Sequence, residues 1–194
     1  NLLAVLAVAV AKQALKFCEQ RIQAIKSVSG RMQMLHIKDK PIIVIDFAHT
    51  PDALENALLA VKPHCKGKVI VIFGCGGNRD VGKRKSMAQV AERLADSVIV
   101  TDDNPRNEAA DIITDDIFEG FNHKHLVTLE HDRAAAIKLG VSQAGAQDLV
   151  LIAGKGHETW QEINGQKNNF SDLKEASLAL GIDVFREIDR EALV

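Results

Sequence analysis

Short apolar runs recur along the chain, and most of them end in a polar loop that carries glycine or proline. Continuous β-branched runs of this kind are typical of parallel strands that are buried on both faces. The segments between the runs have the spacing of amphipathic helices. This alternation predicts an α/β fold, with a Rossmann-like, mostly parallel sheet flanked by helices. We expect strands at 42–46, 68–73, 97–101, 126–129 and 148–153, and helices from Thr50 and at about 83–95, 108–119 and 131–143.

The two ends of the chain depart from this alternation. The pattern over residues 1–26 predicts an Ala- and Leu-rich helix that needs a neighbour to cover its apolar side. The apolar run of this helix is too short to span a membrane. We therefore expect a piece of a larger protein, in which residues 1–29 close a preceding domain and residues 30–194 form the domain proper. Near the other end, Asn164-Gly165 predicts a β-hairpin, and a final helix runs through Leu180.

The composition narrows the functional classes. With 24 Lys and Arg against 26 Asp and Glu, the net charge of -2 gives no electrostatic reason to expect nucleic acid or an acidic membrane as a partner. Three cysteines without a Cys-x-x-Cys pair argue for a reducing, cytoplasmic location and against a disulfide framework or a zinc site. We expect buried or half-buried thiols, with exposure left open for Cys75 in its glycine-rich loop.

Three of the apolar runs end in loops that are unusually rich in charged and amide side chains. In open α/β sheets, ligands bind beyond the carboxyl ends of parallel strands, so these loops predict the rim of an active site. A fourth loop, after the strand at 42–46, adds Asp46 and His49. The three loops are Gly74–Asp80, Thr101–Arg106 and Gly154–Glu158.

The first of these loops leads into a segment, Gly77–Arg84, with the spacing of a phosphate-binding Walker A loop. Arg84 stands where that motif needs the Ser or Thr that holds magnesium, which argues against an autonomous nucleotide-triphosphate site. Arg79, Lys83 and Arg84 beside a helix start remain candidates to hold a phosphate or a carboxylate. The alternative is a glycine-rich turn with solvated charges.

The other two loops carry complementary chemistry. Pro105 stiffens its loop, so that Asn104 and Arg106 offer an amide and a guanidinium fork, which suit a carboxylate beside an amine. An ordinary Asx-Pro turn is the alternative. Gly154–Glu158 combines a cation, a candidate proton carrier and a carboxylate. The remaining histidines lack metal-like spacing and are expected at the surface: His36, His64, His123, His125 and His131.

Taken together and in order, five motifs resemble those of the Mur ligases of peptidoglycan synthesis. The chain is most similar to the carboxy-terminal domain of the diaminopimelate-adding members, and residues 1 to about 29 resemble the closing helix of the family's central ATPase domain. Departures are modest: Phe47 replaces the usual Tyr, and Asn78 and Lys85-Ser86 stand where Asp and Pro are common. The motifs are Gly30-Arg31, Asp46–Asp52, Phe73–Arg84, Thr101–Arg106 and Gly154–Glu158.

The resemblance implies two groups of binding residues. One matches the pocket for the distal amino-acid end of meso-diaminopimelate, where arginines face a carboxylate and a glutamate faces an ammonium. In this family the same loop marks selection of meso-diaminopimelate over L-lysine. That group consists of Arg79, Asn104, Arg106, Gly154 and Glu158. The second group matches positions around the nucleotide and consists of Asn1, Arg31, Asp46 and His49.

The activity that the resemblance implies is that of an ATP-dependent amide ligase. Such an enzyme adds meso-diaminopimelate to UDP-MurNAc-L-Ala-D-Glu through an acyl phosphate, with Mg2+ offsetting phosphate charge. The phosphate loop, the Mg2+ ligands and the main catalytic residues would belong to the central domain, so no catalytic residue and no metal ligand is assigned to this chain. We expect the chain to supply amino-acid recognition and a lid, and to be inactive by itself.

Two alternatives remain at this stage. The first is a folylpolyglutamate synthase, an enzyme of the same ligase superfamily. The Asp103–Arg106 loop argues against this alternative. A free-standing Rossmann-type nucleotide-binding module is the alternative from a different class. Against it, no Gly-x-Gly-x-x-Gly follows the first strand, and a helix without a partner precedes the domain.

Overall fold

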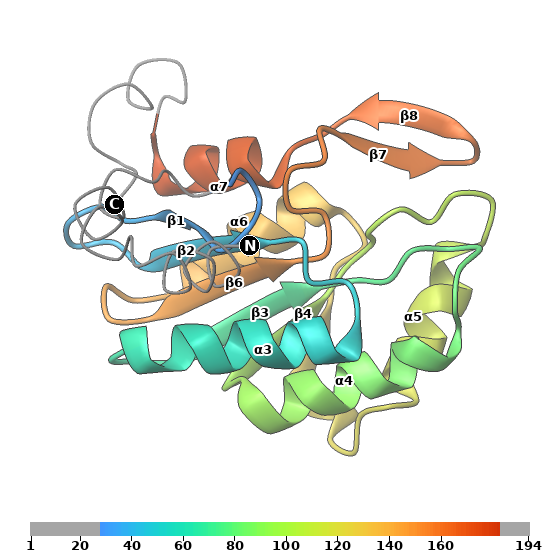
Figure 1. Ribbon diagram of the computed structural model, residues 1–194, viewed down its shortest axis with the longest axis horizontal. Coiled ribbons are helices and arrows are strands. Elements are labelled where there is room, and N and C mark those ends of the chain that lie inside the picture. Colours follow the sequence, from blue (N-terminus) through green and yellow to red (C-terminus); the bar gives the residue numbers. More distant parts are fainter. Residues whose placement is uncertain (1–27, 183–194) are drawn as a thin grey trace, which may run out of the picture.

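The computed structural model describes residues 28–182, which form a six-stranded sheet with helices on both faces (Figure 1). Its strands are β1 (Gln33–Leu35), β2 (Ile42–Asp46), β3 (Val69–Phe73), β4 (Ser97–Val100), β5 (Val127–Leu129) and β6 (Leu149–Ala153). They lie in the order β1-β2-β6-β3-β4-β5. β1 pairs antiparallel with β2, and the other neighbouring pairs are parallel. The α/β fold predicted from the apolar runs is confirmed.

The helices divide between the two faces of the sheet, as Figure 1 shows. One face is covered by α3 (Pro51–Val61), α4 (Gly82–Leu94) and α5 (Ala110–Phe118), and the other by α6 (Arg133–Gln143) and α7 (Asp172–Leu180). Short 3-10 turns occupy Lys62–His64 and Lys124–Leu126. The predicted hairpin is present as β7 (Trp160–Ile163) and β8 (Gln166–Asn169), which form a separate two-stranded sheet.

Local sequence explains where the helices begin. The Thr50 side chain accepts a hydrogen bond from the Ala53 backbone N–H, and Pro51 occupies the first turn of α3. Asp132 caps α6 and Ser171 caps α7 in the same way. The observed bounds differ from the predicted ones by one or two residues, because the ends of apolar patterns do not mark the last hydrogen bond.

The core lies in two layers, one on each side of the sheet. Alternate strand residues point to opposite faces, so that Val71 and Leu151 pack with α3 and α4, whereas Ile72 and Ile152 pack with α6. Because both faces are covered, β3 and β6 are buried along their whole length. The continuous apolar runs in the sequence are the direct result.

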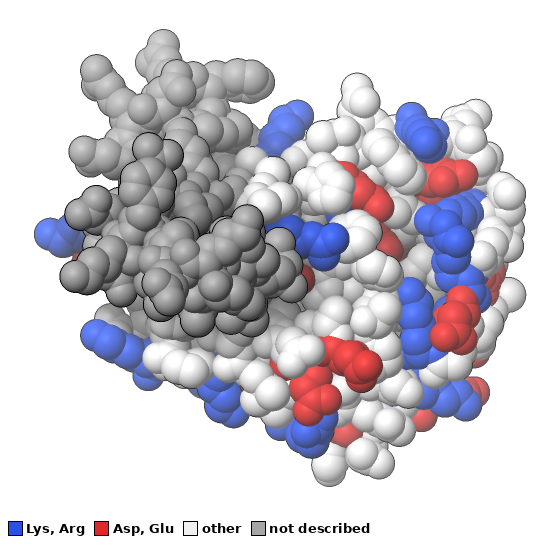
Figure 2. Space-filling model, in the orientation of Figure 1, with Lys and Arg blue, Asp and Glu red and all other residues white. Residues whose placement is uncertain are grey.

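The sheet order places the polar loops together. After β5, helix α6 returns the chain to the middle of the sheet, where β6 lies between β2 and β3. The carboxyl ends of β2, β6, β3 and β4 therefore lie side by side at one edge, as predicted. Figure 2 shows acidic and basic side chains intermingled over the visible face. Within residues 28–182, no helix combines the length and apolar character that crossing a bilayer requires.

Candidate ligand-binding site

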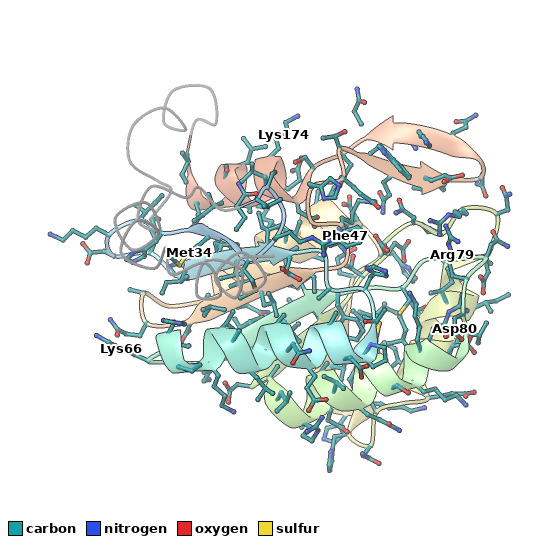
Figure 3. All side chains as sticks on the ribbon, viewed as in Figure 1. Met34, Phe47, Lys66, Arg79, Asp80 and Lys174 are labelled. Carbon is teal, nitrogen blue, oxygen red and sulfur yellow. The ribbon has the colours of Figure 1, made fainter. Side chains whose placement is uncertain are left out.

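A cavity of about 470 Å³ lies at the carboxyl edge of the sheet, among the loops that follow β2, β3, β4 and β6. A volume of this size is typical of small-molecule sites. Figure 3 shows Phe47 on the loop after β2, with Arg79 and Asp80 farther right on the loop after β3. The structure brings all five residues of the expected diaminopimelate group to this cavity: Arg79, Asn104, Arg106, Gly154 and Glu158.

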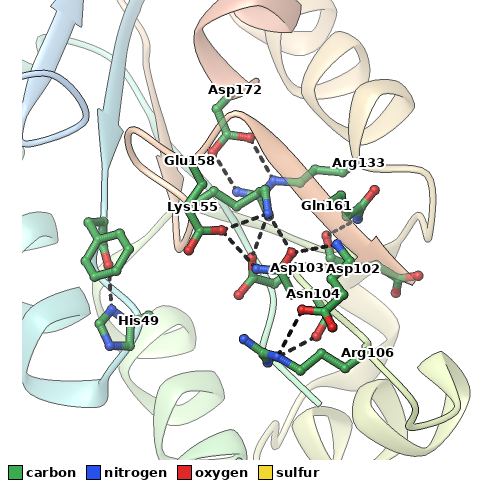
Figure 4. Close-up of polar contacts among 12 residues, drawn as sticks. His49, Asp102, Asp103, Asn104, Arg106, Arg133, Lys155, Glu158, Gln161 and Asp172 are labelled. Atoms are coloured by element: carbon green, nitrogen blue, oxygen red, sulfur yellow. Dashed lines mark hydrogen bonds and ion pairs between the residues drawn. The ribbon is translucent and has the colours of Figure 1, made fainter. Parts of the chain in front are cut away.

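Asn104 is held at both ends of its side-chain amide (Figure 4). Its Nδ2 donates to Glu158 Oε2 at 2.9 Å, and its Oδ1 accepts from Lys155 Nζ at 2.9 Å. The Glu162 backbone N–H donates to the same oxygen at 3.0 Å. Because both donors must face the amide oxygen, the contacts decide which way the amide points.

Lys155 is a fully buried cation behind the cavity wall. Its Nζ also donates to Glu158 Oε2 at 3.1 Å and lies 3.6 Å from Asp103 Oδ1. Lys155 is not among the binding residues expected from the sequence. The polar neighbours that bury it come from two different loops, and no local pattern shows which of their side chains contact Lys155.

A second buried pair, Arg133 with Asp172, joins α6 to α7 beneath the same loop. Arg133 Nε donates to Asp172 Oδ1 at 2.8 Å and Nη2 donates to Oδ2 at 2.9 Å. Nη2 also donates at 3.0 Å to the carbonyl of Ala153, the residue before Gly154. Gly154 has a φ of +120°, which an L side chain rarely adopts, so the turn at the end of β6 needs glycine. The pair thereby anchors the strand end that leads into the cavity wall.

Asp103 lies between these two groups and is almost completely buried. Burial raises the pKa of its carboxyl above the usual range, and the nearby charges of Arg133 and Lys155 oppose that rise. Among the described residues, Oδ1 of Asp103 has no hydrogen-bond partner. Asp103, Arg133 and Asp172 are likewise not among the site residues expected from the sequence.

Arg106 is held in an uncommon backbone conformation by the hairpin. Its φ is +55°, which costs a non-glycine residue roughly 1–2 kcal/mol. The Arg106 N–H donates to the Glu162 carbonyl at 2.9 Å, and the Asn164 N–H donates to the Arg106 carbonyl at 2.6 Å. The guanidinium Nη1 donates to the Gly77 carbonyl at 2.9 Å. Pairing with β7 thus sets the direction in which the Arg106 side chain leaves the loop.

The structure corrects the proposed role of Arg84 in anion binding. Its side chain is fully buried and makes two hydrogen bonds to Glu108, at 2.6 and 2.8 Å, and one to Asp116 at 2.8 Å. Hydrogen bonding to Arg84 lowers the pKa of Glu108. Arg84 therefore ties α4 to α5 and is not available to a ligand.

The other two cations of that segment do border the cavity. Lys83 Nζ donates to the His49 carbonyl at 2.8 Å and so ties α4 to the loop after β2. Arg79 is exposed, and among residues 28–182 its guanidinium forms no ion pair. The Arg79 side chain is thus available to bind an anion.

Of the residues expected around a nucleotide, the structure describes three: Arg31, Asp46 and His49. Arg31 lies with its guanidinium carbon 4.4 Å from the Phe47 ring centroid, and the His49 ring packs edge-on against the same ring at 4.5 Å. The Asp46 carboxylate accepts backbone N–H bonds from Met32 and Ala48. Of the three, only His49 lines the cavity. Asn1 lies outside the described residues.

Four of the remaining histidines are exposed, as predicted: His36, His64, His123 and His125. His131 is half-buried instead, and its ring nitrogens lie 2.9 Å from Asp102 and 3.3 Å from Asp111. Among residues 28–182, no group of three or more His, Cys, Asp or Glu side chains is placed to hold a metal ion.

Cys75 is buried rather than exposed in its loop. Burial raises the pKa of its thiol to about 12, since the neutral form is favoured away from water. At pH 8 we expect iodoacetamide to alkylate Cys75 at least about a hundredfold more slowly than the half-buried Cys65, because only the thiolate reacts. Peptide mapping by mass spectrometry measures both rates, with the urea-unfolded chain as the control. Equal rates in the folded chain would contradict the burial of Cys75.

A sequence model of the family described as Mur ligase, glutamate ligase domain matches residues 30–156. The chain therefore belongs to the Mur ligase family. A solved folylpolyglutamate synthase/dihydrofolate synthase from Yersinia pestis has a TM-score of 0.55 at 19% identity, which shows a shared fold alone.

The more similar relatives carry one name. The chain is 56% identical over 151 residues to the UDP-N-acetylmuramoyl-L-alanyl-D-glutamate--2,6-diaminopimelate ligase of Pseudomonas putida, covering 78% of this chain and 30% of the relative. It is 49% identical over 187 residues to that of Coxiella burnetii, covering 93% and 37%. A solved structure of a ligase of that name has a TM-score of 0.76 at 41% identity, covering 91% of this chain and 37% of the other. The chain spans about a third of the length of these relatives.

Proposed function

We propose that this chain is the amino-acid-recognising part of an ATP-dependent ligase that joins meso-diaminopimelate to UDP-MurNAc-L-Ala-D-Glu. The observation that carries the proposal is the presence of opposite charges in one cavity, which Arg79, Arg106 and Glu158 all line. An amino-acid end, with one carboxylate and one ammonium, fits such a cavity. The names of the more similar relatives support the same substrates.

The proposed division of labour follows from the chemistry of the ligand. Both ends of meso-diaminopimelate carry a carboxylate and an amine. If Arg79, Arg106 and Glu158 hold the distal end, the amine of the proximal end is left to attack the activated carboxylate of the acceptor. Fixing one reactant in this way lowers the entropic part of the barrier. The residues of this chain thus bind and orient the nucleophile.

The residues described here do not fit a complete ATP and Mg2+ site. Arg84 replaces the magnesium-binding hydroxyl of a Walker loop and is committed to Glu108 and Asp116. The described residues also offer no metal-ligand cluster. We therefore assign ATP and Mg2+ to another part of the ligase and derive no step through them, with Arg31, Asp46 and His49 proposed to close over the nucleotide. Residues 1–29 are proposed to end the ATPase domain, and residues 30–194 to form the carboxy-terminal domain.

Titration of the 194-residue chain with meso-diaminopimelate and with L-lysine, followed by NMR, tests the proposal. We expect meso-diaminopimelate to bind at least about tenfold more tightly, since L-lysine leaves the arginine side of the cavity without a partner. The resonances that meso-diaminopimelate shifts should belong to Arg79, Asn104, Arg106 and Glu158. Equal affinity for the two ligands, or shifts confined to other faces, would refute the assignment of the cavity.

A further inference from the structure

Four polar side chains meet at the inner end of the cavity: Asp103, Asn104, Lys155 and Glu158 (Figure 4). Asp103, Asn104 and Glu158 line the cavity, whereas Lys155 lies behind them and is fully buried. A buried ammonium needs compensating partners. Lys155 finds them in the three residues that a ligand would meet.

The hydrogen bonds of Asn104 leave one N–H of its side-chain amide for a ligand. A side-chain amide has an oxygen with two lone pairs and a nitrogen with two hydrogens. Lys155 Nζ and the Glu162 N–H occupy the oxygen, at 2.9 and 3.0 Å. Nδ2 donates one of its hydrogens in a hydrogen bond to Glu158 Oε2 at 2.9 Å. The second N–H of Asn104 remains, and a hydrogen-bond donor suits a carboxylate oxygen rather than an ammonium.

The same contacts divide the two oxygens of Glu158. Oε2 accepts from both Asn104 Nδ2 and Lys155 Nζ, at 2.9 and 3.1 Å. Among the described residues, Oε1 has no such partner. The positive charge of Lys155 lies between the two carboxyl groups of Asp103 and Glu158, at 3.6 and 3.1 Å. Without Lys155, two neighbouring carboxylates would share the wall.

We propose that Lys155 is a positioning residue: it fixes Asn104 with its NH2 toward the cavity, so that Asn104 joins Arg106 in binding the ligand's carboxylate, and it leaves Oε1 of Glu158 for the ligand's ammonium. This inference rests on the proposed function and goes beyond it by giving the buried Lys155 a role in orienting the Asn104 amide. Lys155 itself touches no ligand. It decides specificity through the orientation of a neighbouring amide.

Lys155→Met and a matched control, Lys167→Met, test the proposal. Both lysines lie near the Trp160 ring, with Nζ at 5.6 and 4.2 Å from its centroid, but Lys167 is exposed on β8. In the Lys155 variant we expect affinity for meso-diaminopimelate to fall about tenfold or more, as for loss of a charge-assisted contact, and affinity for L-lysine to change less than about threefold. The control should leave both affinities unchanged.

NMR of the side-chain amide adds a readout that a purely structural role would not change. In the wild-type chain, meso-diaminopimelate should shift the NH2 signal of Asn104, whereas L-lysine should leave it in place. In Lys155→Met, that signal should move even without ligand, because the amide is no longer held. An unmoved signal, or equal losses of affinity for both ligands, would overturn the proposal.

A second variant covers the case in which Lys155→Met does not fold. Asn104→Asp keeps the oxygen that accepts from Lys155 but replaces the donor with a second oxygen. We expect it to lose meso-diaminopimelate affinity about tenfold or more and to keep most of its L-lysine affinity, because only the carboxylate contact is lost. Unchanged preference for meso-diaminopimelate would overturn the proposal. If the wild-type chain binds neither ligand, the proposed function fails, and the free-state signal of Asn104 in Lys155→Met still decides whether Lys155 positions the amide.

Discussion

Replacing Arg133 with methionine is expected to destabilise the fold by about 3–5 kcal/mol, the range found when one partner of a buried ion pair is removed. The side chains of Arg133 and Asp172 are both fully buried, and two hydrogen bonds at 2.8 and 2.9 Å join them. Methionine fills a similar volume but leaves the Asp172 carboxylate without its partner. Urea unfolding of the 194-residue chain measures the change in the free energy of unfolding.

Two further variants separate the charge from the packing. Arg133→Met combined with Asp172→Leu should recover a large part of the loss, because position 172 then carries no buried charge without a partner. Arg93→Met is the matched control, since its pair with Glu55 at 3.0 Å is at the surface and should contribute less than about 1 kcal/mol. A loss below about 1 kcal/mol in Arg133→Met would mean that the pair does not stabilise the fold, and an unrecovered double variant would point to lost packing instead.

The parallel sheet could be predicted from sequence because both of its faces are covered. Burial on both sides requires apolar residues at every position of β3 and β6, so both strands stand out in the sequence as continuous apolar runs. The place of β6 between β2 and β3 could not be predicted in the same way. It depends on the crossover through α6, and no local pattern records which strands become neighbours.

The residues that line the cavity could also be predicted, whereas their buried support could not. Residues such as Asn104 and Glu158 follow apolar runs, and parallel strands bring their carboxyl ends to one edge. Arg133 stands in the first turn of α6, where a cation opposes the helix dipole and is expected in solvent. Its partner Asp172 is far away in sequence. Arg84 was misassigned for the same reason, because Glu108 and Asp116, which neutralise it, come from other segments.

Arg106→Ala is expected to reduce kcat/KM for meso-diaminopimelate by on the order of tenfold to a hundredfold, equivalent to about 1.4 to 2.8 kcal/mol. The assay uses a full-length ligase in which this chain forms the amino-acid-recognising part. The Arg106 guanidinium is already oriented by the Gly77 carbonyl at 2.9 Å and lies 3.6 Å from Glu162, so the wild-type fork is in place before the ligand binds. Alanine removes the fork and leaves Glu158 to hold the ammonium, whereas the KM for ATP should change little.

The preference between substrates is the sharper measurement. L-lysine has the distal ammonium but no distal carboxylate, so its poor use should change less than that of meso-diaminopimelate, and the ratio of the two kcat/KM values should shrink. Arg106→Lys keeps the charge without the two-pronged geometry and should fall between wild type and Arg106→Ala. Arg93→Ala, at an exposed pair in the last turn of α4, is the control. If Arg106→Ala instead raised the KM for ATP and kept the preference for meso-diaminopimelate, Arg106 would belong to the nucleotide side, and the carboxylate would have to be held by Arg79 and Asn104.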